Sequence, residues 1–308
     1  MKVDLIYGGP GREAAVSRTS GRAVEAAMRR LGYDLQVIDL QGELDVARLR
    51  LGAVVFNIVH GTYGEDGTLQ RLFEKAGRSY VGSDAAASAL CMDKWKTKER
   101  LKAEGMRVPW AVRVDLGTPF SPKDLKLPHH GGLVLKPVAD GSSVGLRIVP
   151  SPSFVLPAVE ELLASGVKPQ PYLIEECLPG PEYTCAVLDE DGGPRALPPI
   201  RIVPAQGAYD YDAKYQRDDT RYDMVADATL AAKLQALAVR AHALCGCRDV
   251  SRTDLMRTAD DDIAVLELNT LPGFTDHSLT PKAAAAAGIG FDQLVDRLVR
   301  RAAARMTP

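Results

Sequence analysis

The chain has 308 residues and a formal net charge of −2, with 46% hydrophobic and 25% charged residues. This composition is typical of a soluble globular protein with room for about two or three domains, and the balanced charge argues against nucleic acid or an anionic membrane as the partner. The five cysteines match no zinc-binding spacing, the first residues lack a signal-peptide pattern, and no uncharged apolar run could span a membrane. We therefore expect a cytoplasmic protein with reduced thiols.

The N-terminal part of the chain alternates between predicted strands and helices. We predict apolar strands at residues 3–7, 35–38 and 53–58, and a helix at about residues 12–31. This βαβ pattern is typical of a parallel sheet flanked by helices. Two glycines stand before the first helix, where a turn can receive an anion, although a simple tight turn is the commoner meaning.

Residues 60–70, HGTYGEDGTLQ, form a glycine-rich segment that follows a predicted buried strand and opens a helix. The glycines at positions 61, 64 and 67 imply unusual backbone torsions and the close approach of another group. His60, at the end of the strand, could orient a substrate carboxylate or amine. The alternative is that His60 only caps the turn.

Lysines beside two predicted elements could meet phosphate groups. Lys136 follows a predicted buried strand at residues 133–135 and precedes the glycine- and serine-rich loop 141–145. The backbone N–H groups of such a loop can cradle phosphate oxygens while a lysine adds a point charge; the alternative is a surface hairpin with a snorkelling lysine. A second run is typical of a solvated helix face: Lys94, Lys96, Lys98 and Lys102.

Residues 205–221 are polar and rich in Gly, Asp and Tyr, and they show neither a helical nor a strand period. The length of this segment favours a functional lid over a plain connection. Simple disorder is the alternative, and the tyrosines at positions 209, 211 and 215 argue against it.

A predicted hairpin at residues 250–279 places four polar side chains in one patch. Its two strands flank a turn at residues 258–262. If Asp254 lies opposite Glu267, then Arg252 lies opposite Asn269, and all four side chains share one face. Carboxylate and carboxamide oxygens suit Mg²⁺, which usually shares them with substrate phosphates. The alternative is that the two carboxylates are solvated strand ends, although the apolar run 263–266 indicates that the second strand is buried.

These segments together resemble the D-alanine–D-alanine ligases of the ATP-grasp superfamily over essentially the whole chain. The resemblance implies an ATP-grasp fold of α/β and α+β type, with three domains and the nucleotide between the central and C-terminal domains. The boundaries that we predict are residues 1–94, 95–174 and 175–308, with the lid at about residues 205–221.

The resemblance also assigns roles at the nucleotide. Two ions of Mg²⁺ (or Mn²⁺) are expected on Asp254, Glu267 and Asn269. The residues expected to bind ATP comprise two phosphate lysines, an adenine-binding hinge, a ribose-binding acid and a lysine of the lid: Lys94, Lys136, Glu175, Glu176, Cys177, Leu178, Glu182 and Lys214.

Further roles are implied at the reacting groups. Ser142 and Tyr215 belong to closing loops, Arg252 and Lys214 offset negative charge, and Gly273 N–H is an oxyanion donor. Tyr215 in the lid matches the ligases of this family that form a dipeptide rather than a depsipeptide. This match favours D-alanine over D-lactate as the second substrate. The residues expected at the two substrates are Glu13, His60, Ser278 and Leu279.

One departure from the family pattern concerns the first substrate. The family has a glutamate directly before a Val-Ser pair on the first helix, where it binds the ammonium of the first D-alanine, and this chain has Ala15. Glu13 is the nearest acid, but on a regular helix two residues turn it about 200° away. Glu13 can therefore serve only if this end of the helix is irregular.

The function implied by the resemblance is ATP-dependent ligation of two D-alanines through an acyl phosphate, for peptidoglycan precursors. Because of Ala15, a ligase for a different pair of amino or hydroxy acids stays open, as does a non-catalytic ATP-binding protein. The expected partners are D-alanine and ATP, with no nucleic acid and no membrane. A homodimer is expected from the resemblance alone.

Overall fold

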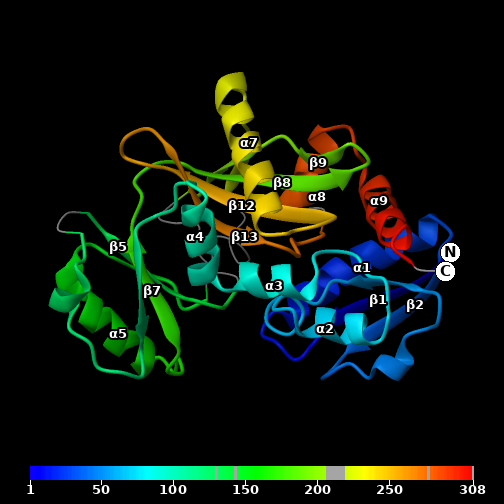
Figure 1. The fold of residues 1–308 in the computed structure, drawn as a ribbon, viewed down its shortest axis with the longest axis horizontal. Coiled ribbons are helices and arrows are strands. Elements are labelled where there is room, and N and C mark those ends of the chain that lie inside the picture. The colour runs from blue at the N-terminus through cyan, green and yellow to red at the C-terminus, as the bar shows by residue number, and fades with distance from the viewer. Residues whose placement is uncertain (129–130, 142–143, 206–218, 276–277, 307–308) are drawn as a thin grey trace.

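The fold is described by a computed structural model over residues 1–128, 131–141, 144–205, 219–275 and 278–306. Three sheets run in a row along the molecule (Figure 1). No helix within these ranges is long and apolar enough to cross a membrane. All five cysteines are free thiols, as predicted.

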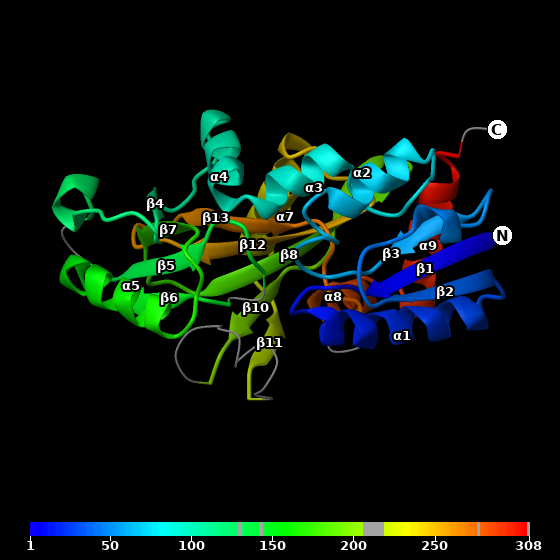
Figure 2. The same ribbon diagram turned by 90° about the horizontal axis from the view of Figure 1, so that it is seen from below.

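The first sheet is parallel, as the βαβ pattern predicted. Its order is β2-β1-β3, with β1 (Lys2–Gly8), β2 (Asp34–Leu40) and β3 (Val54–Asn57). The connecting elements are α1 (Ala14–Arg30), η1 (Val46–Arg48), α2 (Thr68–Lys75) and α3 (Ala85–Met92). Alternate residues of β1 face opposite cores: Leu5 packs with residues of α1, and Ile6 packs with residues of α2. Figure 2 shows α1 and α2 on opposite faces of this sheet.

The second sheet is antiparallel and has the order β4-β7-β5-β6. Its strands are β4 (Ala111–Asp115), β5 (Leu133–Pro137), β6 (Arg147–Val149) and β7 (Pro171–Glu176). The helices of this part are α4 (Lys94–Ala103), η2 (Pro122–Leu125), η3 (Pro152–Phe154) and α5 (Val155–Ala164). Val155, Val159 and Leu162 of α5 pack on the sheet and close a separate core.

The third sheet is also antiparallel, with the order β11-β10-β8-β12-β13 and β9 paired to β8. Its strands are β8 (Glu182–Glu190), β9 (Gly193–Ala196), β10 (Ile200–Val203), β11 (Arg221–Met224), β12 (Val250–Arg257) and β13 (Ile263–Asn269). Its helices are α7 (Ala228–Leu244), α8 (Leu279–Ala286) and α9 (Phe291–Ala303). Cys185 and Val187 of β8 face α7, whereas Ala186 and Leu188 face the core that holds α8 and α9.

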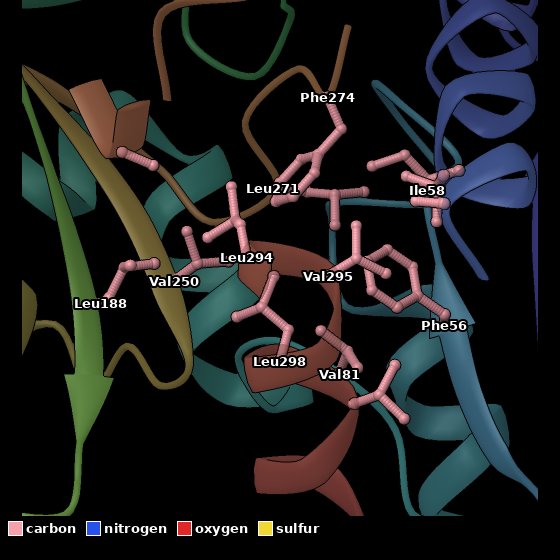
Figure 3. Close-up of a cluster of buried hydrophobic side chains, with 14 of the residues drawn as sticks. Phe56, Ile58, Val81, Leu188, Val250, Leu271, Phe274, Leu294, Val295 and Leu298 are labelled. Carbon is pink, nitrogen blue, oxygen red and sulfur yellow. The ribbon is translucent and has the colours of Figure 1, made fainter. Parts of the chain in front are cut away.

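The last helix joins the third sheet to the first. Figure 3 shows Leu294, Val295 and Leu298 of α9 between Leu188 of β8 and Phe56 of β3. At the rim, Arg30 of α1 binds Asp292 of α9 through two contacts of 2.6 and 2.8 Å. The core of the C-terminal part is therefore continuous with that of the N-terminal part.

Truncation of this shared core lowers stability. Leu298 is 1% exposed, so Leu298→Ala is expected to lower the free energy of unfolding by about 2–5 kcal/mol, because it leaves a cavity between two sheets. Denaturant unfolding measures the change. Leu156→Ala is the matched control, since Leu156 of α5 is 40% exposed; an equal loss in both variants would contradict the shared core.

Candidate active site

The hairpin β12–β13 has the predicted register. Asp254 lies opposite Glu267, and Arg252 lies opposite Asn269. The register shifts directly after Asp254, so that Leu255 lies opposite Val265. The irregularity therefore comes after the polar patch and leaves its four side chains on one face.

Asp254 is a buried, paired carboxylate. Arg252 donates to both of its oxygens, with Nε 2.9 Å from Oδ1 and Nη2 2.8 Å from Oδ2, and Thr184 Oγ1 donates to Oδ1 at 2.6 Å. Asp254 is 5% exposed. The alternative of a solvated strand end is wrong for this residue, since a buried charge without partners would be costly.

Glu267 stands where two cavities meet. Its side chain is 30% exposed, and its Oε2 lies 3.7 Å from Lys94 Nζ. Lys94 also donates to the carbonyl of Asp140 at 2.6 Å. Both cavities are lined by Lys94, Asp140, Gly141 and Glu267.

The larger cavity, of about 450 Å³, collects the predicted substrate residues. Its lining includes Glu13, His60, Glu65, Arg252, Asn269, Gly273, Ser278 and Leu279. The elements that supply them are the start of α1, the glycine-rich segment after β3, the hairpin, and the start of α8.

His60 is held at both ring nitrogens. Its Nε2 lies 3.1 Å from Ser20 Oγ, and its Nδ1 lies 3.4 Å from Glu65 Oε1. Glu65 Oε1 also accepts a hydrogen bond of 2.7 Å from Gly61 N–H. Turn capping does not account for these contacts. Sequence reasoning missed Glu65, although it lies in the glycine-rich segment that had been singled out.

Glu13 points into the larger cavity because it precedes the regular helix. The first residue of α1 is Ala14, and Glu13 is its N-cap with φ −86° and ψ 8°. A Cβ atom on Gly61 would overlap Glu13 Oε2, and one on Gly141 would lie 2.8 Å from that oxygen. Ala15 is exposed and is not among the residues that line the cavity. The irregular helix end that Glu13 requires is therefore present.

The smaller cavity, of about 140 Å³, collects the predicted nucleotide residues. Its lining includes Lys94, Lys136, Glu175, Glu176, Cys177, Leu178 and Glu182, together with Asp254 and Glu267. Lys136 Nζ lies 2.6 Å from Glu175 Oε1. The alternative of a snorkelling surface lysine is wrong, since Lys136 is 7% exposed.

Charge pairing governs the smaller cavity. Burial works against the positive charge of Lys136, but the carboxylates of Glu175 and Glu267 outweigh it and raise the lysine's pKa. Burial likewise works against the Glu175 carboxylate, but Lys136 and Lys98 outweigh it and lower that pKa. Both groups are therefore charged at neutral pH.

The loop after β13 leads to the start of α8. Ser278 is the N-cap of α8, and its Oγ accepts a hydrogen bond of 3.0 Å from Thr275 N–H. A Cβ atom on Gly273 would lie 2.8 Å from that oxygen. The backbone N–H groups at a helix start, Leu279 among them, favour a carboxylate ligand. Three predicted residues lie outside the described ranges: Ser142, Lys214 and Tyr215.

The candidate metal ligands are few. Across the described ranges, no three or more His, Cys, Asp or Glu side chains converge to hold a metal by themselves. Mg²⁺ is commonly bound by one or two carboxylates plus substrate phosphates. Asp254 and Glu267, paired across the strands beside the smaller cavity, fit that pattern.

Comparison with known proteins identifies the family. Residues 123–300 match the profile described as D-ala D-ala ligase C-terminus, and residues 41–83 match that of the D-ala D-ala ligase N-terminus. This chain belongs to the D-alanine–D-alanine ligase family. The family's ATP-grasp fold was predicted from the motifs and is confirmed by the solved structures below.

Relatives of this family member match along its whole length. The D-alanine–D-alanine ligase of Ralstonia pickettii (strain 12J) is 41% identical and covers 98% of this chain and 91% of its own. The Bacillus anthracis D-alanine–D-alanine ligase complexed with ATP is 31% identical, with a TM-score of 0.82 over 98% of this chain and 96% of its own. The Enterococcus faecalis VanG D-Ala:D-Ser ligase is 28% identical, with a TM-score of 0.83 over 98% of this chain and 99% of its own.

Proposed function

We propose that this ligase-family chain joins two D-alanines to D-alanyl-D-alanine at the expense of ATP, for peptidoglycan precursors. One observation carries the proposal. The cavity with the predicted nucleotide residues and the cavity with the predicted substrate residues share a wall of four residues, Lys94, Asp140, Gly141 and Glu267. Phosphoryl transfer from one ligand to the other needs such a junction, because the attacking oxygen must approach the γ-phosphorus in line with the leaving oxygen of ADP.

ATP occupies the smaller cavity in this proposal. Residues 175–178 meet the base, Glu182 meets the ribose, and the phosphates extend toward the shared wall. Lys136 is charged and buried there, with Lys94 at the wall itself. Buried cations stabilise the charge that develops on the transferred phosphoryl group more strongly than exposed ones do.

A divalent metal completes the nucleotide site. Asp254, Glu267 and Asn269 are the residues that would hold Mg²⁺ or Mn²⁺, with phosphate oxygens as further ligands. When bound, the metal would screen negative charge on the β- and γ-phosphates. Arg252 orients the Asp254 carboxylate through its two hydrogen bonds.

The first D-alanine occupies the larger cavity. The carboxylate of Glu13 binds its ammonium, and His60 is held in place for it by Ser20 and Glu65. The substrate's carboxylate oxygen attacks the γ-phosphorus, ADP leaves, and an acyl phosphate forms. Arg252 lines the same cavity and offsets the charge that develops.

The second D-alanine enters beside α8. Ser278 and the Leu279 N–H bind its carboxylate, and its amine attacks the acyl carbon, with Gly273 N–H as a donor to the oxyanion. Phosphate leaves and the amine loses a proton. Ser142, Lys214 and Tyr215 close over the site in this proposal and exclude the water that would hydrolyse the acyl phosphate.

The deciding experiment measures phosphate release from ATP and dipeptide formation by the purified chain with Mg²⁺. We expect both products in equal amounts with D-alanine, and neither with L-alanine. ATP binding without D-alanine-dependent release would contradict the D-alanine assignment, and absence of ATP binding would contradict the ligase function.

A ligase for a different acid pair is the second candidate. It is favoured by Ala15, which replaces the usual acid, and by the likeness to a D-Ala:D-Ser ligase. D-serine and D-lactate, each tested as first and as second substrate beside D-alanine, separate the two candidates. A non-catalytic role is disfavoured, because Arg252, Asp254 and Glu267 lie together as transfer chemistry requires.

The division into domains is also proposed. One sheet falls in each of the ranges 1–94, 95–174 and 175–308, which supports it, although β7 extends to Glu176 and so crosses the second boundary. A homodimer, the absence of nucleic-acid partners and a cytoplasmic location stay predictions.

A further inference from the structure

Lys98 departs from the solvated face predicted for the lysines of α4. Lys96 has a side chain that is 65% exposed, and Lys102 is exposed as well. The side chain of Lys98 is only 5% exposed. Lys98 lies one helical turn after Lys94, on the same face of α4, and its amine reaches the carboxylate of Glu175 in β7.

The Glu175 carboxylate is shared between two lysines. Lys136 Nζ lies 2.6 Å from Oε1, and Lys98 Nζ lies 2.9 Å from Oε2. The contact of Lys98 is an ion pair between two buried side chains. Glu175 and Lys136 line the nucleotide cavity, and Lys98 is not among the lining residues. Lys98 thus supports the carboxylate from behind.

Charge balance gives this arrangement a consequence. Two lysines and one glutamate carry a net charge of +1, and Lys136 faces the side where phosphates would lie. If Lys98 were absent, the charges of Lys136 and Glu175 would cancel. The Glu175 carboxylate would then pair with the Lys136 amine alone. Interactions between buried charges are screened weakly, so this change would be felt by a bound polyphosphate.

We infer that Lys98 is a positioning residue of the nucleotide site, which holds Glu175 from behind and leaves the charge of Lys136 available to the phosphates of ATP. The inference rests on the proposed function, because ATP is the ligand that the site would take. Lys98 itself touches neither ATP nor the other substrates.

The ionisation of Lys98 supplies an independent readout. Burial lowers its pKa to about 8, against the opposing effect of Glu175, and Lys136 lowers it further, while Glu267 opposes the shift. The pKa of Lys136 is raised and that of Glu175 is lowered, so neither changes charge between about pH 7 and 9. Lys98 therefore loses its positive charge as the pH rises through about 8, and the apparent affinity for ATP should fall over the same range.

Steady-state kinetics and direct binding with the full chain test the inference. Lys98→Met should raise KM for ATP by at least about tenfold with a smaller change in kcat, the size expected for loss of a charged partner. The loss of affinity should be greater for ATP than for AMP, because the missing charge acts on the polyphosphate. Lys102→Met, an exposed change on the same helix, should leave both constants unaltered.

The conservative variant and pH complete the test. Lys98→Arg should restore most of the affinity and remove the fall between pH 7 and 9, because arginine stays charged. Equal losses for ATP and AMP, an unchanged KM in Lys98→Met, or the same pH profile in wild type and Lys98→Arg would overturn the inference. If Lys98→Met does not fold, the pH comparison decides alone. Failure of the wild type to bind ATP would instead refute the proposed function.

Discussion

Glu267→Gln is expected to lower kcat by about 10³-fold, because Glu267 lies on the shared wall of the two cavities and is a proposed ligand of the metal. Glutamine keeps the shape of the side chain but removes one negative charge from the proposed metal site. The Lys94 amine, 3.7 Å from Glu267 Oε2, loses its ion pair in the same step. Dipeptide formation measured over a range of Mg²⁺ concentrations gives the size of the effect.

The matched control is Asp261→Asn in the turn of the same hairpin. Asp261 is exposed and pairs with Arg257 at 2.7 Å, far along the hairpin from the polar patch. Its left-handed φ of 64° is one that asparagine tolerates. This variant should retain the wild-type rate. A near-normal rate in Glu267→Gln would rule out its role as a metal ligand.

Glu13→Ala is expected to raise KM for the first D-alanine by about 10²-fold, because the substrate ammonium would be desolvated without a charged partner. The carboxylate lies against Gly61 and Gly141, at the side of the larger cavity that adjoins the nucleotide residues. Kinetics with D-alanine concentrations spanning both binding steps separate the KM of the first substrate from that of the second. The second KM should change little, since Ser278 and Leu279 lie on a different element.

Arg12→Ala is the control for Glu13→Ala, because Arg12 is the exposed neighbour at the same end of α1. It should leave both constants as they are. Unchanged kinetics in Glu13→Ala would mean that another group binds the ammonium, and Glu65 in the same cavity would then be the first to test.

The hairpin shows how far local rules reach. Strand alternation predicted that Arg252 lies opposite Asn269 if Asp254 lies opposite Glu267, and the structure has both pairs. The register shift after Asp254, which local rules did not predict, is what brings Asp254 opposite Glu267. The parallel first sheet followed in the same way from alternating strands and helices. The family's motifs then predicted most of the polar residues of both cavities, since each motif is short and contiguous, although Glu65 was missed.

The lysines of α4 show where local rules stop. Lys96 and Lys98 have the same chemistry two residues apart, yet one is exposed and the other is buried on Glu175. The difference depends on β7, which is distant in sequence, and on the direction from which α4 approaches it. The roles of Ser142, Lys214 and Tyr215 stay predictions, because these residues lie outside the described ranges.

By itself, the sequence determined the parallel first sheet, the family and most of the residues that line the two cavities, because these depend on spacing along the chain. The tertiary structure alone decided three features: that α1 begins late enough for Glu13 to reach the substrate cavity, that Lys98 is buried, and that α9 packs on the first sheet. Each depends on packing between segments far apart in the chain. The spacing of apolar residues within one segment does not predict which distant segment it contacts.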